Sequence, residues 1–462
     1  MTPPDRLDVP PGPRGLAAAP AVLGFLRDPL ATMRAAAAEY GDVVHVRAGT
    51  ARVFLLVHPD AVKDVLVTHH RRFTGLAFEA AKRLIGEGLL SAQGAAHRRQ
   101  RRLVQPAFHR DRMAGYAATM AEHAGRWAEG QRDGAEVAVR DEMMRLTLGI
   151  VGETMFGAAE GEAAEEVRAL LDAGLALFGP FTAFAARQAE RLPLPRSRRF
   201  TAARAALDAR VFAMLAARRA DPEDRGDLLS MLLAAQDAGE GDEAGGGEAG
   251  GGGLTDRQIR DEVVTIFLAG HETTASALTW AWSRLAANPD AERRLHAELD
   301  AVLGGRAPVP ADLPRLPYAS AVFAEALRLY PTIPMIFRRA VEEHEAGGYR
   351  IPRGAVVILS QYVTQRDARF FPDPERFRPE RWLEEGRGER PRHAYFPFGG
   401  GPRVCIGEHF AAAEGALVLA SAASRWRLVG GPGPPPLPDP RFGTRPPETL
   451  RMRMVARGPA PR

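Results

Sequence analysis

A long helical pattern that begins at Thr255 limits the possible folds of this chain more than any other feature. Thr255-x-x-Gln258 is a capping-box sequence, which marks the start of a helix, and helical periodicity continues to about Ala287, before Asn288-Pro289. With a rise of ~1.5 Å per residue, this helix would be ~50 Å long. A compact chain of this length has a radius of gyration of only about 23 Å. The helix must therefore cross the whole molecule and be buried over much of its length.

Polar residues interrupt the middle of this predicted helix, in Ala269-Gly270-His271-Glu272-Thr273-Thr274. A glycine in a helix interior costs ~1 kcal/mol relative to alanine, and a buried carboxylate or hydroxyl is costly unless it has a partner. One interpretation is a local kink in which the threonine hydroxyls bond back to the preceding turn. The other is a functional site. For His271, a local hydrogen bond is a simpler prediction than a zinc-binding or catalytic role.

The segment Phe396–Gly407 contains Cys405, the only cysteine of the chain. Three consecutive glycines and a proline predict a tight loop, because glycine adopts positive φ freely and proline fixes its own φ. A helical pattern, Glu408–Ala423, follows directly, and its N-terminus should favour the thiolate form of Cys405. Such a thiolate can be a nucleophile or the single protein ligand of a metal, and a lone cysteine can also be a small buried side chain. A nucleophile needs a nearby base, which this loop does not supply.

Five positions around this cysteine, Phe398-x-x-Gly401-x-Arg403-x-Cys405-x-Gly407, are similar to the heme-ligand signature of the cytochrome P-450 family, FxxGxRxCxG. The polar segment 269–273 resembles the oxygen-binding motif of the same family, (A/G)Gx(D/E)T. The resemblance covers nearly the whole chain. It implies a fold that is mainly α with a smaller β-rich region. In that fold a long central helix lies over heme b, and Cys405 is the thiolate ligand of the iron.

The resemblance also implies roles for individual residues of both motifs. On the central helix, Ala269 and Gly270 would contact the heme, and Gly270 would leave room for dioxygen. Thr273 would hydrogen-bond the iron-bound peroxo group, and Glu272 would relay protons from solvent. In the cysteine loop, the metal ligand and its neighbours would bind the cofactor: Pro397, Phe398, Arg403, Cys405 and Gly407.

A charged pair, Glu325 and Arg328, lies three residues apart on a predicted helix, Ala319–Leu329. Taken alone, such a pair is most often a surface ion pair worth ~0.3 kcal/mol. The spacing resembles the family's ExxR, and Pro374-Glu375-Arg376-Phe377 resembles its PERF segment. The resemblance therefore implies a buried network of Glu325, Arg328 and Arg376 that locks the loop leading to the cysteine.

Further basic residues are candidates for binding the heme propionates. His97 and Arg101 lie four residues apart, and so on one face, of a helix that should begin near Gly94. The surrounding sequence is similar to the segment with which the family holds a propionate. Arg338, in preference to Arg339, and Arg403 are also candidates, because the planar guanidinium binds carboxylates bidentately. The neighbouring Arg98, Arg99 and Arg102 are expected to point outward, where they could attract an acidic electron-transfer protein.

The family motifs on the two sides of residues 239–253 belong to one site, so the resemblance implies a single domain over residues 1–462. Within it, 1–15 is a Pro-rich tail, and 239–253, built only from Gly, Glu, Asp and Ala, is an expected disordered loop. The basic residues are not accompanied by a nucleic-acid-binding motif, and a single cysteine excludes intrachain disulfides. No stretch is apolar and long enough to span a membrane, so a cytoplasmic protein is expected. A helix over Leu30–Tyr40, a hairpin of 43–47 with 53–57 and a helix over Pro59–Leu66 are predicted near the start, and nearly everything from Ser91 to about Ala235 has a helical pattern.

The function that the resemblance implies is a monooxygenase, which inserts one oxygen atom from O2 into a lipophilic small molecule. Because only 57 residues follow Cys405, electrons should come from separate carriers, a ferredoxin and its reductase. A peroxide-driven enzyme, a heme isomerase or dehydratase, and a heme-binding sensor are the alternatives. By family position, the substrate pocket should draw on mostly apolar residues: Phe73, Leu76, Phe78, Phe178, Phe181, Phe184 and Ile336.

Overall fold

The structure is a computed structural model that describes residues 9–76, 82–157, 195–221, 223–240, 254–383, 388–431, 436–438 and 444–458. The chain forms two compact units. The first unit comprises Met1–Ala77, Ala124–Met143 and Thr274–Arg462, and the second comprises Phe78–His123 and Met144–Thr273. The start of the predicted tail and most of the predicted loop 239–253 lie outside the described residues. Gly239 and Glu240 are described, and they end a helix instead of beginning that loop.

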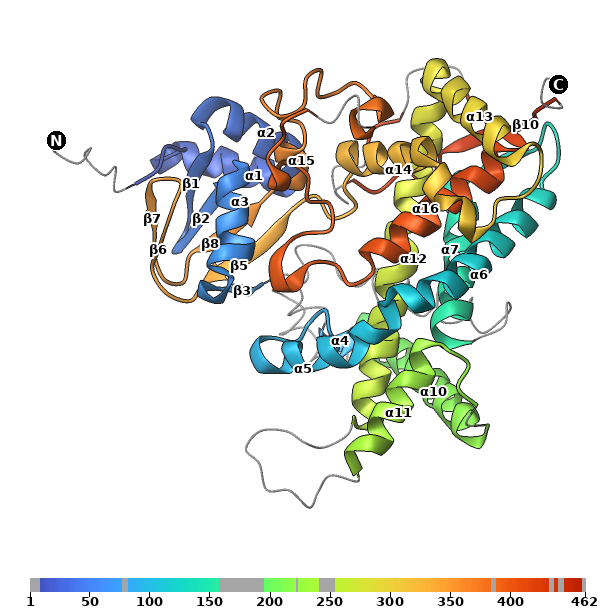
Figure 1. Cartoon of the computed structure of the whole chain (residues 1–462). Coiled ribbons are helices and arrows are strands. Elements are labelled where there is room, and N and C mark those ends of the chain that lie inside the picture. Colours follow the sequence, from blue (N-terminus) through green and yellow to red (C-terminus); the bar gives the residue numbers. More distant parts are fainter. Residues whose placement is uncertain are drawn as a thin grey trace. The chain divides into compact units, whose positions relative to one another are not determined.

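A five-stranded sheet with the order β1-β2-β8-β5-β3 forms one part of the first unit (Figure 1). The predicted hairpin is confirmed, because β1 (Val43–Ala48) pairs antiparallel with β2 (Ala51–Leu56). Strand β2 runs parallel to β8 (Val356–Leu359), which pairs antiparallel with β5 (Ile336–Ala340), and β5 pairs with β3 (Phe73–Gly75). The sheet is therefore assembled from two regions that are far apart in the sequence, 43–75 and 336–359.

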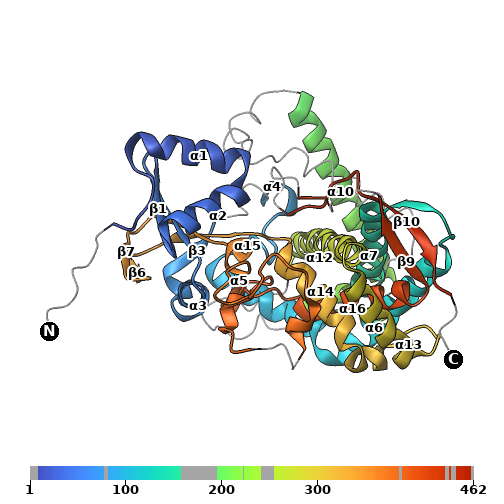
Figure 2. The same ribbon diagram turned by 90° about the horizontal axis from the view of Figure 1, so that it is seen from above.

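Successive residues of β2 point to opposite faces of this sheet, and both faces are covered. Leu55 packs with α1 (Ala18–Arg27) and α2 (Pro29–Tyr40) on one face, in a cluster with Leu30 and Met33. Phe54 and Leu56 pack with Val62, Val65 and Leu66 on the other. Figure 2 shows α1 and α2 on one side of these strands and α3 on the other. The predicted helix Leu30–Tyr40 is confirmed, and it ends at Gly41 with a positive φ of 91°.

Helix α3 (Pro59–Lys63) continues into a π-helical turn, Asp64–Thr68. The sequence predicted a helix in this region but not the change of helix type. The wider turn is closed by a hydrogen bond from the backbone N–H of His69 to the carbonyl oxygen of Asp64, at 2.8 Å. Residues five apart, rather than four, are consequently aligned along this segment.

The remaining helices of the first unit include α13 (Pro289–Leu303), α14 (Pro317–Leu329), α15 (Gln361–Thr364) and α16 (Glu408–Ala423). Gly415 allows α16 to approach α14 closely, since an added Cβ would lie 2.4 Å from Cδ2 of Phe323. Two small sheets complete this unit. One pairs β6 (His344–Ala346) with β7 (Tyr349–Ile351), and the other has the order β4-β10-β9, from Glu136–Ala138, Arg451–Ala456 and Trp426–Gly430. Strand β4 falls in a region whose pattern predicted only helices.

The described part of the second unit is helical, and three of its helices, α6, α7 and α12, also contribute residues to the first unit. Its elements are α4 (Lys82–Ile85), α5 (Gly94–Val104), α6 (Arg110–Glu129), α7 (Val139–Phe156), α10 (Pro195–Ala220), α11 (Leu228–Glu240) and α12 (Asp256–Ala286). Within the second unit, α7 packs on α12 through the stacked rings of Phe156 and Phe267, 4.2 Å apart. A buried ion pair of Arg218 and Asp227 and the carbonyl of Phe156, which accepts from Arg218, connect α10, α7 and the start of α11.

The long helix predicted from Thr255 is α12, with 31 residues. Its capping box is formed as the sequence indicates: the backbone N–H of Thr255 donates to Gln258 Oε1 at 2.9 Å, and the backbone N–H of Gln258 donates to Thr255 Oγ1 at 3.2 Å. Within the described ranges, no helix combines the length and the apolar character needed to cross a membrane.

Candidate active site

The cysteine loop belongs to the first unit and leads directly into α16. Cys405 is exposed, and its backbone N–H donates to the carbonyl of Phe398 at 2.9 Å, so the chain between them forms a closed loop. Gly407 is the N-cap residue of α16, which places Cys405 just before the free N–H groups of the helix N-terminus. An exposed sulfur at this position is well placed to act as a metal ligand.

Gly401 has a conformation and a contact that only glycine allows. Its φ is +66°, and an added Cβ would lie 1.9 Å from the carbonyl oxygen of Leu66. Leu66 belongs to the π-helical turn, so this turn packs directly against the cysteine loop at Gly401. Gly399 also has a positive φ, of 76°, and its nearest neighbour is the side chain of Ile336 in β5.

Strand β5 carries Arg338, the candidate propionate ligand, within the same unit. Burial and, to a smaller extent, the positive charge of Arg403 in the cysteine loop together lower the pKa of Arg338 to about 10. The hydrogen bond that the structure gives its guanidinium goes to the carbonyl of Phe337, at 3.0 Å, and among the described residues no carboxylate pairs with Arg338. Two neighbouring guanidinium groups with this burial suit an anionic ligand.

Arg339, the alternative to Arg338, points to the opposite face of β5 because neighbouring residues of a strand alternate. It is exposed, whereas Arg338 is half-buried. This difference favours Arg338 as the residue beside the cysteine loop.

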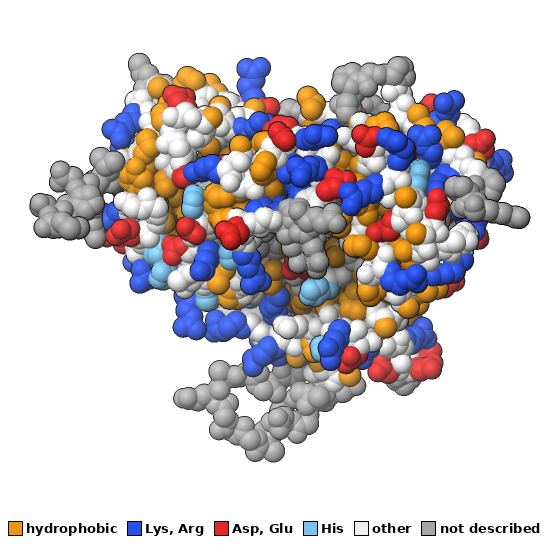
Figure 3. Space-filling model, turned by 45° about the horizontal axis from the view of Figure 1, so that its top comes forward, with side chains coloured by type: hydrophobic (Ala, Val, Ile, Leu, Met, Phe, Trp, Pro, Cys, Tyr) orange, Lys and Arg blue, Asp and Glu red, His pale blue; other side chains and the backbone are white. Residues whose placement is uncertain are grey.

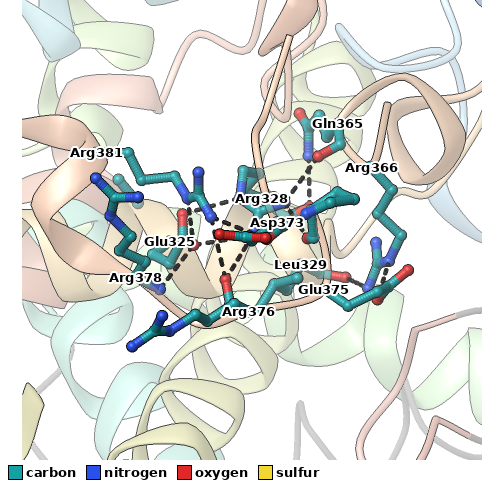
Figure 4. Close-up of polar contacts among 12 residues, drawn as sticks. Glu325, Arg328, Leu329, Gln365, Arg366, Asp373, Glu375, Arg376, Arg378 and Arg381 are labelled. Carbon is teal, nitrogen blue, oxygen red and sulfur yellow. Dashed lines mark hydrogen bonds and ion pairs between the residues drawn. The ribbon is translucent and has the colours of Figure 1, made fainter. Parts of the chain in front are cut away.

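The acidic residue of the predicted charge network, Glu325, is fully buried together with Arg328 (Figure 4). Arg328 donates from Nη2 to Oε1 of Glu325 at 2.8 Å and from Nε to Oε2 at 2.9 Å. The interpretation of this pair as a surface ion pair is therefore wrong. Glu325 also accepts from the backbone N–H of Arg378 at 3.0 Å and from Trp382 Nε1 at 2.9 Å.

The third charged member of this network is Arg381, and the prediction of Arg376 is wrong. Arg381 Nε donates to Glu325 Oε1 at 3.0 Å, and its side chain is 5% exposed. Arg376 contributes only its carbonyl oxygen, which accepts from Arg328 Nη2 at 3.1 Å. The triplet Pro-Glu-Arg occurs twice, at 374–376 and at 379–381, and the network uses the second copy. This repetition is the signal that could have identified Arg381.

Gln365 connects the network to the cysteine loop, a role that no motif in the sequence indicates. Arg328 Nη1 donates to the carbonyl of Gln365 at 2.9 Å. The side-chain Oε1 of Gln365 accepts from the backbone N–H of Phe396 at 3.1 Å, and its Nε2 donates to the carbonyls of Leu327 and Arg328. The start of the cysteine loop is thus fixed to the end of α14 through one buried amide.

Glu414 is a second buried carboxyl group of this unit that sequence reasoning missed. It lies on α16 with 0% exposure, and burial raises its pKa to about 8, although a hydrogen bond with Thr274 of α12 opposes the increase. The group is therefore predominantly protonated near neutral pH in the folded chain. An acidic residue on an alanine-rich helix gave no sign of this burial.

The oxygen-motif residues lie on α12 in the second unit. Residues before and after them on this helix are buried, but Ala269 is exposed and Glu272 and Thr273 are half-buried. Thr273 Oγ1 donates to the carbonyl oxygen of Ala269, one turn earlier, at 2.7 Å. The predicted bond of a threonine hydroxyl to the preceding turn is confirmed, and this short stretch of the helix is open on one side.

Gly270 packs against another helix of the second unit. An added Cβ would lie 2.8 Å from Cγ2 of Val151, so glycine at this position lets α7 approach α12. His271 is buried, and its Nδ1 lies 2.5 Å from the carbonyl of Phe267, which confirms the predicted local hydrogen bond. Thr147 Oγ1 donates to the carbonyl of His271 at 2.9 Å and connects α7 to the same stretch.

The two remaining propionate candidates, His97 and Arg101, lie on α5, which begins at Gly94 as predicted. His97 is 6% exposed and Arg101 is half-buried, whereas Arg98 and Arg102 are exposed on the other side of the helix. The predicted division of α5 into an inward and an outward basic face is confirmed for these four residues, whereas Arg99, which was also predicted to point outward, is half-buried.

Comparison with known proteins agrees with the motifs. The family described as Cytochrome P450 by its model, written P-450 here, matches residues 10–452. The chain belongs to the cytochrome P-450 family. Cyclooctatin synthase from Streptomyces melanosporofaciens is 41% identical over 460 residues, which cover 97% of this chain and 95% of that protein. Pentalenene oxygenase from Streptomyces avermitilis is 34% identical and covers 94% of each chain.

Solved structures extend this result to the fold. The heme domain of cytochrome P-450DA has a TM-score of 0.84 and 26% identity, covering 97% of this chain and 98% of that one. The protein is accordingly a cytochrome P-450 monooxygenase with the mainly α fold of the family and its smaller β region, and its activity is the oxygenation of a lipophilic small molecule.

Proposed function

We propose that this cytochrome P-450 binds heme b with Cys405 as the thiolate ligand of the iron. The proposal rests on two features of the first unit. The only cysteine of the chain is exposed on a glycine-rich loop, and Arg338 lies half-buried beside Arg403 with no carboxylate partner among the described residues. A flat ligand with an iron and two carboxylates needs both kinds of group. Bound heme supplies the iron at which dioxygen is activated.

Arg338 and Arg403 hold the propionates in this proposal, and His97 and Arg101 are the candidates from α5. The backbone of Pro397, Phe398 and Gly407 shapes the loop around the sulfur, and free N–H groups at the start of α16 stabilise its negative charge. The buried network of Glu325, Arg328 and Arg381 supports this loop through Gln365. The 1–462 chain acts as a single domain, in agreement with one family match over residues 10–452.

Thr273 and Glu272 are proposed to hold and transfer protons on the exposed face of α12. Thr273 Oγ1 gives its own proton to the carbonyl of Ala269, so its lone pairs remain available to accept a hydrogen bond from a proton-bearing group. Glu272 is half-buried and can take a proton from solvent and release it near Thr273. Ala269 leaves space on this face, whereas Gly270 serves the packing of α7.

A terpenoid is the substrate class that we propose. Cyclooctatin synthase, cyclooctat-9-en-7-ol 5-monooxygenase and pentalenene oxygenase are between 34% and 41% identical to this chain. Of the predicted pocket residues, Phe73 is buried and Ile336 half-buried in the five-stranded sheet. Leu76, directly after β3, is half-buried, and the other residues that the prediction named, Phe78, Phe178, Phe181 and Phe184, lie outside the described residues. An apolar cyclic hydrocarbon or alcohol is consistent with this composition.

Electrons are proposed to come from a ferredoxin and its reductase, acting on an enzyme in the cytoplasm. The exposed Arg98 and Arg102 of α5 can attract an acidic carrier. On the face that Figure 3 presents, Lys and Arg side chains are spread widely with acidic side chains among them. On this face (Figure 3), attraction of a protein carrier would therefore depend on local positive groups rather than on one continuous basic surface.

The deciding experiment is the ferrous–CO difference spectrum of the purified protein beside Cys405→Ser. A far-red Soret band that the variant loses is the expected result. A band typical of histidine ligation, or no bound heme, would contradict the proposal. With the wild-type spectrum in hand, turnover of a cyclic diterpene alcohol with a ferredoxin system, compared with turnover driven by peroxide, separates a monooxygenase from a peroxide-driven enzyme.

A further inference from the structure

Three potential metal ligands, Asp64, His69 and His344, meet in the first unit, at a place that the proposed heme chemistry does not use. Nδ1 of His69 lies 2.5 Å from Oδ1 of Asp64, and Nε2 of His344 lies 2.5 Å from Oδ2 of the same carboxylate. The three ligand atoms all lie within 4.8 Å of one another. We propose that these residues bind a Zn²⁺ ion.

The π-helical turn creates half of this site. Asp64 is its first residue and His69 follows its last, and the bond between their backbone groups stacks the two side chains on one face. An ordinary α-helix would align residues three or four apart instead, so it would separate this pair. Because π-helical turns are rare and are found frequently at functional sites, this conformation is compatible with a functional role for the pair.

His344 in β6 provides the third ligand from a rigid position. Its side chain is 3% exposed, and its ring packs edge-on against Phe73 with centroids 5.2 Å apart. Phe73 belongs to the same apolar cluster as Val65 and Leu66 of the π-helical turn. The hairpin and the turn are therefore held together by packing before any ion binds.

The donor set matches the preferences of zinc. Two imidazole nitrogens and one carboxylate oxygen are common zinc ligands, with bonds of about 2.0–2.2 Å and a water in the fourth tetrahedral position. The side chains of His69 and Asp64 are 42% and 24% exposed, so a water can reach that position. Tetrahedral ligand atoms lie about 3.4 Å apart at these bond lengths. Each histidine nitrogen would therefore move about 1 Å away from its aspartate oxygen, and the two nitrogens, now within 4.8 Å of each other, would adopt the same spacing.

Arg72 is the feature that opposes the ion. Its Nη1 lies 3.3 Å from Nδ1 of His344, and its Nε pairs with Glu342 at 2.8 Å. Since a guanidinium can only donate, Nδ1 of His344 accepts and the ring proton sits on Nε2, which donates to Asp64. To bind zinc through Nε2, His344 must move this proton to Nδ1, where it would face Arg72. An acceptor in place of Arg72 would remove the conflict and orient the ligand.

The site has a structural consequence for the cysteine loop. An ion bound here would join the β6–β7 hairpin to the π-helical turn, whose Leu66 carbonyl lies against Gly401. The ion would thus make the π-helical turn more rigid, and this turn supports the cysteine loop at Gly401.

The test is zinc binding to the heme-loaded full chain, with any affinity tag removed and metal stripped by a chelator. Heme-loaded protein is used because the thiolate of Cys405 is then unavailable to zinc. Equilibrium dialysis with metal analysis should give one Zn²⁺ per chain, and His344→Gln and His69→Gln should each weaken binding at least tenfold. His70→Gln is the matched control, because its ring bonds to the carbonyl of Val67, and it should bind like the wild type.

Two further measurements make the proposal specific. Arg72→Gln should tighten zinc binding about tenfold, since its amide oxygen can accept the Nδ1–H of His344. Zinc should raise the unfolding temperature of the wild type but not that of His344→Gln, because a ligand stabilises the state that binds it. Equal zinc binding by wild type and His344→Gln, or no bound zinc in the wild type, would overturn the proposal. The cluster would then be a hydrogen-bonded His–Asp–His contact.

Discussion

Glu325 accepts five hydrogen bonds, two from Arg328 and one each from Arg381, the backbone of Arg378 and Trp382. A buried carboxylate is stable only when its charge and lone pairs are satisfied in this way. The network is therefore sensitive to the loss of any charged member, and less sensitive to the loss of a side chain that lies outside it.

Arg381→Ala and Arg376→Ala should separate these two cases. Removal of Arg381 leaves Glu325 buried with one positive partner fewer, at an expected cost of about 3–5 kcal/mol in the free energy of unfolding. Arg376→Ala retains the backbone carbonyl that Arg328 uses, so a cost below about 0.5 kcal/mol is expected. Chemical denaturation of the two heme-loaded variants measures both values. Equal costs would show that the side chain of Arg376 belongs to the network after all.

Among individual residues, the sequence predicted the pair Glu325 and Arg328, because residues three apart on a helix are neighbours on its surface. It did not predict Arg381 or Gln365, because Arg381 lies in a short 3-10 helix and Gln365 in a turn, and tertiary contacts decide where these short segments lie. Two copies of the Pro-Glu-Arg triplet, five residues apart, offer the same local pattern, and only the folded loop distinguishes them. Local spacing thus identifies partners on one element but not partners on a distant loop.

Among the elements, the cysteine loop and the π-helical turn depend on each other through a contact that has no room for a methyl group. Gly401→Ala should therefore prevent the loop from closing and abolish stable heme binding. Gly348→Ala is the matched control, because Gly348 also has a positive φ, of 82°, but nothing within 4 Å of the added Cβ. The control should lose only about 1–2 kcal/mol of stability to backbone strain and retain heme. Heme content per chain, measured by absorbance, decides between them, and retention by Gly401→Ala would contradict the described approach.

Elements with strong local signals were predicted well. The capping box and the Asn-Pro pair placed both ends of α12, and the short turn between two β-like runs placed the β1–β2 hairpin. Strand β4, of three residues, was not predicted, because its assignment rests on pairing with β10, more than 300 residues away. The π-helical turn was not predicted either, because residues 59–66 have a helical pattern that does not specify the width of the turn.

For the whole molecule, the family motifs extend over nearly the entire sequence, so fold and reaction class could be inferred before any coordinates. Proton linkage could not, since it depends on which carboxyl groups the complete fold buries. Glu414 is such a group: its pKa rises from 4.5 to about 8 in the folded chain. Between pH 4.5 and about pH 8, Glu414 is therefore protonated in the folded chain but ionised in the unfolded chain.

Glu414 should consequently make the protein less stable as pH rises. Its contribution is most favourable below about pH 4.5, declines with a slope of up to about 1.4 kcal/mol per pH unit, and is lost above about pH 8. Glu414→Gln keeps the shape and cannot ionise, so the difference in unfolding free energy between variant and wild type should grow in favour of the variant from pH 5 to pH 8. Glu408→Gln, in the first turn of the same helix, is the control. Parallel pH profiles for wild type and Glu414→Gln would contradict the prediction.

The way in which Arg328 holds the segment 365–376 has a consequence for protein engineering. Arg328 binds this segment through the backbone carbonyls of Gln365, Pro374 and Arg376, which every amino acid possesses. The exposed side chains of the segment are therefore free to change without loss of these bonds. A library that randomises exposed positions such as Ala368 and Arg376, while it leaves Arg328 and Gln365 intact, should yield many folded variants. This stretch is a suitable place to install labels or surface charges on the enzyme.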